Sequence, residues 1–297
     1  MSNWTDKVIH HSIWSFIFGG LGSTGFLFML GKTLFGFSLI KSVCFAFLLS
    51  LLVFSLLVFW YSGKDIIIFL TKKKYNSVWG IAIVKLKDAY SGIHDIRKKT
   101  NVDDEEFLRV LTLLCDNLKA IFDKNTGSSC SVSIKVPVSM VENPREMEVR
   151  NLCRDNAHFN RDTERYRQAH HTVIGNTAYF EVVMNILNNR SELAYVNNDI
   201  NGTKDYHNTS FDCYNNGQLD YESEMVYPIL PIKLEGHNYK LFGFICIDCK
   251  KKNGFDEVGF EIPMVQGVAD GIYDIIEKRI NQKEDDGRVQ IQSSSRQ

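Results

Sequence analysis

The sequence predicts an α+β protein with an N-terminal transmembrane helical hairpin, a long linker helix and an antiparallel sheet flanked by helices. Two uncharged apolar stretches occupy most of the first 61 residues. Apolar residues then recur at three- and four-residue steps, as on one face of a helix, and short β-branched segments separated by turn residues follow. The net charge of −1 over 297 residues shows no basic excess, so a nucleic acid polymer is not a predicted partner.

The stretch Val43–Tyr61 gives the strongest membrane signal. It is uncharged, and Ser50 and Ser55 are its only polar residues. At ~1.5 Å of rise per residue, a helix of this length spans about 28 Å, close to the hydrocarbon thickness of a lipid bilayer. Trp60 and Tyr61 end the stretch, where aromatic rings favour the membrane–water boundary. The alternative interpretation is a helix buried in a protein core.

A second uncharged stretch, Ser12–Gly31, predicts an earlier span, so that residues 12–61 form a two-helix hairpin after a polar lead of residues 1–11. Its small residues, among them Gly19, Gly22 and Gly25, would permit close helix approach. Two roles remain open for them: packing the hairpin's own helices together, or lining a pore.

Lysines flank the two spans more densely than they occupy the connection between them. Lys7, Lys64 and Lys72–Lys74 lie outside the hairpin, against Lys32 and Lys41 within it. The positive-inside rule therefore predicts a two-span protein of the inner or plasma membrane with both termini in the cytoplasm. Seven cysteines without a paired framework also suit a reducing compartment.

Residues 62–102 predict a coiled-coil-like linker helix. Trp79, Leu86 and Ile93 recur at seven-residue intervals, which is typical of a seam that associates with another copy of the chain. A new helix then begins at Asp103, where Glu106 completes a capping box. Its apolar seam faces either a dimer partner or the core of its own domain.

The remaining chain predicts one domain, residues 103–281, followed by a disordered tail of residues 282–297. A long polar loop is expected at residues 200–222. The expected strands are Cys130–Val138, Met147–Cys153, Leu193–Val196, Met225–Leu234 and Tyr239–Asp248, with helices at Ile174–Leu187 and Phe255–Ile280.

This order of elements resembles the GAF domain, a small-molecule sensing fold, over residues 103–280. The motifs that carry the resemblance are Tyr195–Asp199, Pro228–Ile232, Leu241–Asp248 with Gly243 in the strand, and Phe255–Glu257 opening the last helix. The resemblance implies a domain that binds a cyclic nucleotide, haem, a bilin or a small metabolite, or that serves as a dimerising module. The cofactor or ligand itself is not identified by these residues.

Polar side chains around the expected pocket are the candidate ligand-binding residues. Arginines that converge on one site would pair with phosphate or carboxylate groups. The alternative for the charged run around Arg165 is a solvated helix face. The candidates are Arg154, Arg165, Arg167, His171, Asn176, Asn197, Asp199 and Tyr206.

Catalytic and metal-binding motifs are not found, so enzymatic activity is not predicted. Cys246 and Cys249 lie three residues apart on a strand, where side chains alternate between the two faces, so the pair is expected to pack rather than to share a metal. His170–His171 has no ligand partner at metal-binding spacing.

The predicted function is that of a membrane-anchored cytoplasmic sensor, and its output has two alternatives. Bacterial antiphage proteins that join two membrane spans to a sensor of nucleotide second messengers have a similar architecture, and in them the membrane hairpin is the output. The absence of an enzyme module after residue 281 favours this interpretation. The alternative is a ligand sensor or dimerising scaffold that signals to a separate partner protein.

Overall fold

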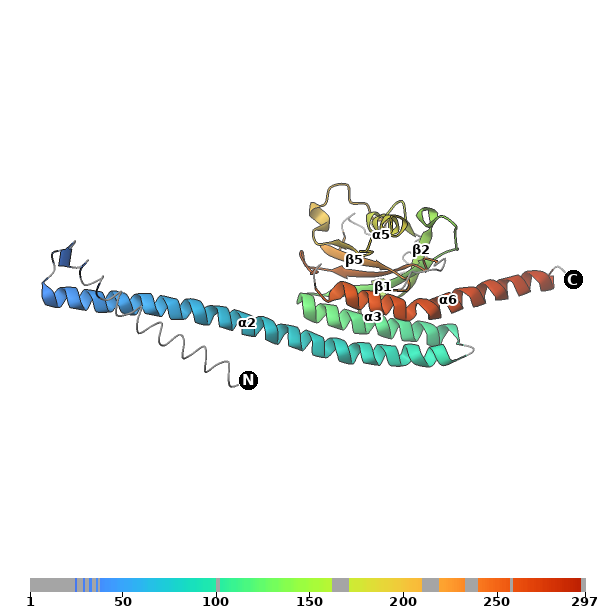
Figure 1. The fold of residues 1–297 in the computed structure, drawn as a ribbon. Coiled ribbons are helices and arrows are strands. Elements are labelled where there is room, and N and C mark those ends of the chain that lie inside the picture. Colours follow the sequence, from blue (N-terminus) through green and yellow to red (C-terminus); the bar gives the residue numbers. More distant parts are fainter. Residues whose placement is uncertain are drawn as a thin grey trace. The chain divides into compact units, whose positions relative to one another are not determined.

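The computed structural model describes residues 38–99, 102–161, 171–209, 219–232, 240–256 and 259–294, together with residues 25, 29, 32, 33 and 36 (Figure 1). The chain divides into two compact units, residues 1–76 and residues 77–297. The helix α2, Leu39–Lys98, contributes residues to both units. Each unit is described by itself below.

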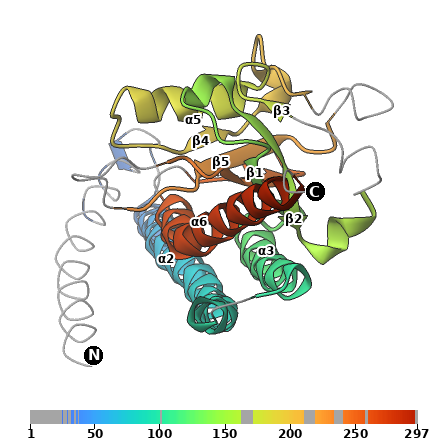
Figure 2. The same ribbon diagram turned by 90° about the vertical axis from the view of Figure 1, so that its right-hand side faces the viewer.

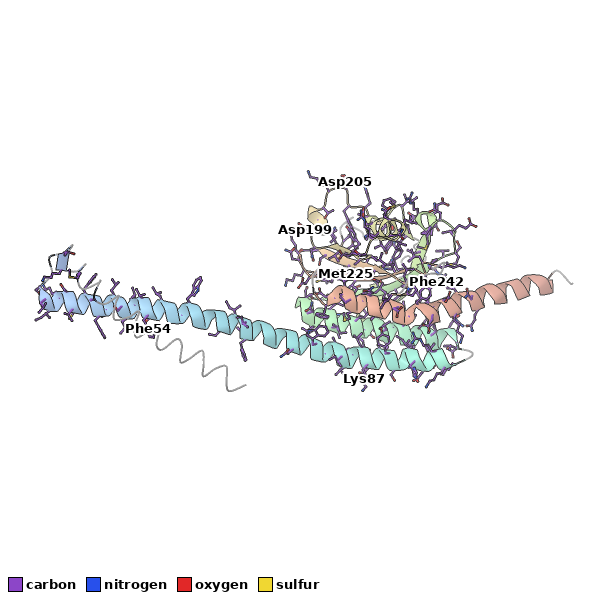
Figure 3. The ribbon with its side chains drawn as sticks, viewed as in Figure 1. Phe54, Lys87, Asp199, Asp205, Met225 and Phe242 are labelled. Atoms are coloured by element: carbon purple, nitrogen blue, oxygen red, sulfur yellow. The ribbon has the colours of Figure 1, made fainter. Side chains whose placement is uncertain are left out.

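The N-terminal unit contains one helix segment, Leu39–Leu56, that is long and apolar enough to cross a membrane, with a mean hydropathy of 2.3. Its large side chains are exposed, as Phe54 illustrates in Figure 3. Trp60 is 64% exposed. These features fit contact with lipid, by length and composition only.

The first predicted span lies almost entirely outside the described residues, as do Gly19, Gly22 and the side chain of Tyr61. Gly25 is helical, and a Cβ added there would meet no atom within 4 Å. The two-span hairpin and the cytoplasmic termini therefore remain predictions.

The second unit is built on one six-stranded sheet, as the α+β prediction requires. Its order is β3-β2-β1-β6-β5-β4, and each neighbouring pair is antiparallel. The strands are β1 (Cys130–Pro137), β2 (Glu148–Arg154), β3 (His171–Thr172), β4 (Tyr195–Asn197), β5 (Ser223–Pro228) and β6 (Phe244–Cys249).

Helices cover the two faces of this sheet unequally. The C-terminal part of α2, α3 (Asp104–Thr126) and α6 (Glu261–Ser294) lie on one face, and α5 (Thr177–Leu187) lies on the other (Figure 2). Short 3₁₀ helices η1 (Pro144–Glu146), η2 (Asn156–Arg161) and η3 (Ile200–Gly202) connect the strands. Asp103 is the N-cap of α3, as predicted, because its side chain accepts a hydrogen bond from the Glu106 backbone N–H at 2.6 Å. The Glu106 side chain accepts a hydrogen bond from Lys99.

The helix-covered face carries the main hydrophobic core. Alternate strand residues such as Val132, Ile134, Ile245 and Ile247 are fully buried there, as is Leu114 of α3. Met225 and Phe242 lie in the same layer, while Lys87 points outward from α2 (Figure 3). Each fully buried aliphatic side chain contributes roughly 1.5–3 kcal/mol, so this face supplies most of the hydrophobic stabilisation.

The residues predicted to associate with another copy of the chain pack instead against this core of their own chain. Ile93 is fully buried, and Leu86 packs against the same cluster within the domain. Trp79 is half exposed, with its ring centroid 4.6 Å from that of Phe260. The seam needed an apolar partner, and α3 and α6 of its own chain provide one.

The contact between α2 and α6 is close and specific. The Tyr90 hydroxyl donates to the carbonyl of Gly267 at 2.7 Å, and a Cβ at Gly271 would lie 2.5 Å from the Tyr90 ring. Arg97 pairs with Asp274. Residues 77–98, expected in a separate linker, therefore form one wall of the domain.

The start and the end of the last helix also differ from the prediction. Phe255 does not open the last helix, because its backbone N–H donates to the Asn198 side chain, which in turn donates to the Phe255 carbonyl. Helix α6 begins at Glu261 and continues to Ser294, where a disordered tail was expected from residue 282.

Strand β6 begins at Phe244 rather than at Tyr239. Gly243 before it has φ +117°, and a Cβ there would lie 1.9 Å from the carbonyl oxygen of Lys135. The chain that enters β6 therefore passes so close to β1 that only glycine fits at position 243. The turn of the predicted hairpin lies outside the described residues.

Candidate functional site

The face of the sheet that α5 covers carries both polar side chains and a smaller apolar cluster, in contrast to the opposite face, which carries the main hydrophobic core. The strand register places its inward-pointing residues in rows, because side chains alternate along each strand. One row runs Asn197, Glu224, Asp248 and Ser131 across β4, β5, β6 and β1. The next row runs Tyr195, Val226, Cys246, Ser133 and Arg154, and a third ends in Lys135 and Asn151. We call this surface the polar face.

Three atoms of the polar face are buried without a hydrogen-bond partner. They are Asn151 Oδ1, Arg154 Nε and Glu224 Oε1. The described residues contain five such atoms in all, so most of them gather on this one surface. An unpaired buried polar group costs about 1–3 kcal/mol, and one in a native structure calls for a missing partner such as a ligand or water.

Glu224 is the most perturbed carboxyl group of the site. It is 3% exposed, and burial raises its pKa to about 8, with the charge of Asp248 adding to the shift and the hydrogen bond from Tyr206 opposing it. The group is thus largely protonated at neutral pH. A neutral carboxyl both donates and accepts hydrogen bonds, so Glu224 suits a ligand that offers an acceptor, a donor or both.

A hydrogen-bonded network of tyrosines and amides borders Glu224. Tyr206 bonds to Glu224, and burial raises the pKa of its phenol well above the usual range. Asn208 donates to the hydroxyl of Tyr206 at 3.0 Å and to that of Tyr221 at 2.9 Å. The Asn197 amide likewise donates to Tyr195 and Thr203. These bonds fix the side chains before any ligand arrives.

Helix α5 closes the apolar part of the polar face. Tyr179 stacks on Phe244 with ring centroids 4.7 Å apart and an interplanar angle of 11°. The Tyr179 hydroxyl lies 3.6 Å from Cys246 Sγ, and Val182 and Val226 belong to the same cluster. The face therefore combines an aromatic and apolar cover with unsatisfied polar atoms, a composition typical of small-molecule sites.

Three of the predicted ligand-binding residues lie on or beside this surface. Arg154 is at the end of β2 with its unpartnered Nε, and Asn197 is 9% exposed at the end of β4. Tyr206 contacts Glu224. The structure thus brings these three residues of separate segments to one face.

Three other candidates have structural partners of their own. Asn176 caps α5 by accepting from the Tyr179 backbone N–H, and His171 Nδ1 lies 2.6 Å from Thr209 Oγ1. Asp199 caps η3 and pairs with Lys252 at 2.5 Å, and that lysine lowers the pKa of the carboxyl. Arg165 and Arg167 lie outside the described residues.

Sequence reasoning did not select Glu224, Asp248, Asn151, Ser131, Ser133 and Lys135 as site residues. The alternation in Cys130–Val138 already placed Ser131, Ser133 and Lys135 on one face of a strand, so that signal was present. Glu224 was not found because β5 was predicted to begin at Met225, one residue after it.

Cys246 and Cys249 lie on opposite faces of β6, as the strand alternation predicted. Cys246 packs in the cluster under α5, and Cys249 packs in the main core. Among the residues that the structure describes, no group of three or more His, Cys, Asp or Glu side chains is arranged to hold a metal ion.

Comparison with known proteins gives fold-level similarity only. No family model matches the chain, and no curated protein matches it. Similar solved structures include the GAF domains of phosphoenolpyruvate-protein phosphotransferases from Coxiella burnetii (14% identity, 68% of this chain and 98% of that one, TM-score 0.40) and Acinetobacter (11%, 66% and 93%, TM-score 0.39). A free methionine-R-sulfoxide reductase from Neisseria meningitidis in complex with its substrate also matches (12%, 66% and 90%, TM-score 0.36).

Proposed function

We propose that residues 77–294 form a GAF-like sensor domain that binds a small polar ligand on the polar face. The observation that carries this proposal is the gathering of three buried, unpartnered polar atoms on one surface: Asn151 Oδ1, Arg154 Nε and Glu224 Oε1. A ligand that pairs with them relieves their desolvation cost, which gives binding a driving force.

The arrangement favours a ligand with an anionic group at one end and a hydrogen-bonding ring at the other. Arg154 and Lys135 supply positive charge near β2, and the neutral Glu224 carboxyl with Asn197 offers donors and acceptors at β5. Strands lie about 4.8 Å apart, so the three spacings from β2 to β5 amount to roughly 14 Å. A nucleotide second messenger has this length and this division of charge.

The proposed output is the membrane part of the chain. Helix α2 contains both the candidate span Leu39–Leu56 and, at residues 77–98, a wall of the sensor domain. A ligand that favours one packing of α2 against α6 would act on the residues that precede it, in proportion to its differential affinity for the two packings. In this proposal the chain is a two-span antiphage-type effector with both termini in the cytoplasm, and it contains no enzyme.

A separate signalling partner is the second candidate for the output. Ile83 and Val84 of α2 are 66% and 55% exposed, and they offer an apolar surface within the sensor unit. A partner protein, or a second copy of the chain, would bury them. The polar face would then sense the ligand while this surface transmits the signal.

Native mass spectrometry of the purified full-length chain tests the ligand proposal. We expect a retained small molecule in the wild type that is lost from Arg154→Gln and Glu224→Ala. Arg109→Gln, an exposed arginine of α3, is the matched control and should keep the ligand. Equal retention by Arg154→Gln, Glu224→Ala and the wild type would remove the polar face as the site.

Recording membrane potential in cells that express the chain separates the two outputs. Depolarisation that depends on the ligand, and that is lost when Gly22 and Gly25 become Leu, supports the membrane effector. Ligand binding without any change in permeability, together with a co-purifying protein that Ile83→Glu releases, supports the partner-coupled sensor.

A further inference from the structure

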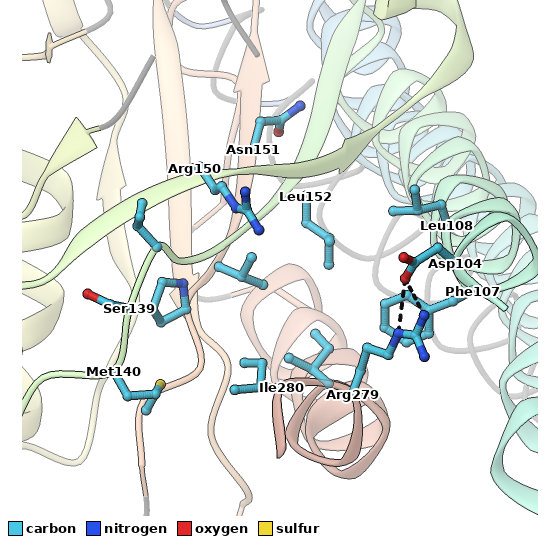
Figure 4. Close-up of a pocket in the computed structure, with 14 residues that line it drawn as sticks. Asp104, Phe107, Leu108, Ser139, Met140, Arg150, Asn151, Leu152, Arg279 and Ile280 are labelled. Atoms are coloured by element: carbon cyan, nitrogen blue, oxygen red, sulfur yellow. Dashed lines mark hydrogen bonds and ion pairs between the residues drawn. The ribbon is translucent and has the colours of Figure 1, made fainter. Parts of the chain in front are cut away.

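A cavity lies on the opposite side of the sheet, which α2, α3 and α6 cover (Figure 4). Its volume is about 450 Å³, within the range of small-molecule sites. Phe107 and Leu108 of α3, the end of β1 with the residues up to Met140, Leu152 of β2, and Ile276 and Ile280 of α6 line it. The walls are therefore mainly apolar and come from four separate segments of the domain.

Two arginines stand at this cavity, and they differ in how they are engaged. Arg279 pairs with Asp104, donates to the Val102 carbonyl at 3.0 Å and lies 5.9 Å from the centre of the Phe107 ring. Arg150 is exposed and makes no hydrogen bond or ion pair within the described part of the chain. Its guanidinium is directed over the cavity toward Leu152, while Asn151 points away (Figure 4). The cavity thus carries one unbalanced positive charge.

We propose that this cavity binds a small apolar molecule that carries a single carboxylate. The apolar body lies between Phe107, Leu152 and Ile280, where burying it removes apolar surface from water. The carboxylate pairs with the guanidinium of Arg150, whose planar donors match two carboxylate oxygens. The unengaged positive charge disfavours a cation, and the apolar walls disfavour a highly charged nucleotide.

This site is independent of the polar face. The strand register turns Arg150 and Val136 toward the helix layer, whereas Asn151 and Lys135 turn toward α5. Asn151 lines the cavity as well, but Arg150, which carries this proposal, is not part of the polar face. The proposal therefore stands or fails apart from the proposed sensing function.

Fluorine NMR of the full-length chain in lipid nanodiscs tests the proposal, with 4-(trifluoromethyl)phenylacetate as the probe. We expect saturable line broadening with the protein that empty nanodiscs do not give. Arg150→Gln should weaken binding about tenfold or more, as expected for the loss of a charge-assisted hydrogen bond. The neutral amide of the same probe should bind to the wild type about as weakly as the carboxylate binds to Arg150→Gln.

Two variants control the experiment. Arg145→Gln removes an exposed arginine that does not line the cavity and should bind like the wild type. Leu108→Trp narrows the cavity from a position that is 36% exposed, so it should abolish binding while the domain stays folded. Absence of saturable binding to the wild type, equal binding of the amide, or wild-type affinity in Arg150→Gln or Leu108→Trp would overturn the proposal.

Discussion

The two faces of the sheet differ in the side chains that they bury. On the face covered by α2, α3 and α6, alternate strand residues are apolar and fully buried. On the face covered by α5, the residues at the same strands are Ser131, Ser133, Glu224 and Asp248, and three polar atoms there lack partners. The first face carries the main core, and the second combines a smaller apolar cluster with buried polar groups. We infer that the main stabilising core and the proposed site for the polar ligand lie on opposite faces of the sheet.

The largest expected effect lies on the helix-covered face. Leu114→Ala removes a fully buried side chain from the main core and should lower the free energy of unfolding by about 2–5 kcal/mol. Ser133→Ala on the polar face is the matched comparison and should change it by less than about 1 kcal/mol. Chemical denaturation of the purified chain, followed by Trp fluorescence, measures both. Equal losses in the two variants would contradict the division between the faces.

The next effect depends on pH and belongs to Glu224. Its ordinary pKa is 4.5, and in the folded domain it holds its proton to about pH 8. Between these values the folded state binds more protons than the unfolded state. The stabilisation is therefore complete below pH 4.5 and is lost as pH rises through about 8, by up to about 1.4 kcal/mol per pH unit.

Glu224→Gln should remove this slope, because glutamine does not titrate. Thermal unfolding measured from pH 5 to pH 9 tests the expectation, with the exposed Glu192→Gln as the matched control. If Glu224→Gln keeps the pH dependence of the wild type, Glu224 is not the group that takes up the proton.

The smallest expected effect has the opposite sign. Asn151→Ala removes a buried acceptor that has no partner in the free protein, so it should be neutral or stabilise the chain by up to about 1–2 kcal/mol. The same variant should weaken ligand retention, as expected where function opposes stability. A clear loss of stability in the ligand-free protein would show that Asn151 has a structural partner.

Local patterns in the sequence predicted the elements of the domain better than their partners. The helix start with Asp103 as N-cap, the strand at Cys130–Val138 and the opposed faces of Cys246 and Cys249 are confirmed, because each depends on neighbouring residues alone. The seam around Ile93 was assigned to another copy of the chain, because periodicity shows that a helix face is apolar but not what covers it.

The site was predictable only in part, for a similar reason. Arg154, Asn197 and Tyr206 were selected as polar residues near an expected pocket, and the structure places them at the polar face. Glu224 was not selected, because its burial follows from its pairing with β4 and β6, which the sequence alone does not reveal. A carboxyl group becomes distinctive only when the fold takes it out of water.

Hydrogen–deuterium exchange of the full-length chain, with and without the molecule it retains, tests the central claim most directly. The account predicts that added protection concentrates in residues 174–209 and in β5, which cover and form the polar face. Residues 104–126 of α3, on the opposite side, should change little. Protection confined to α3 and α6, with residues 174–209 unchanged, would contradict the assignment of ligand binding to the polar face.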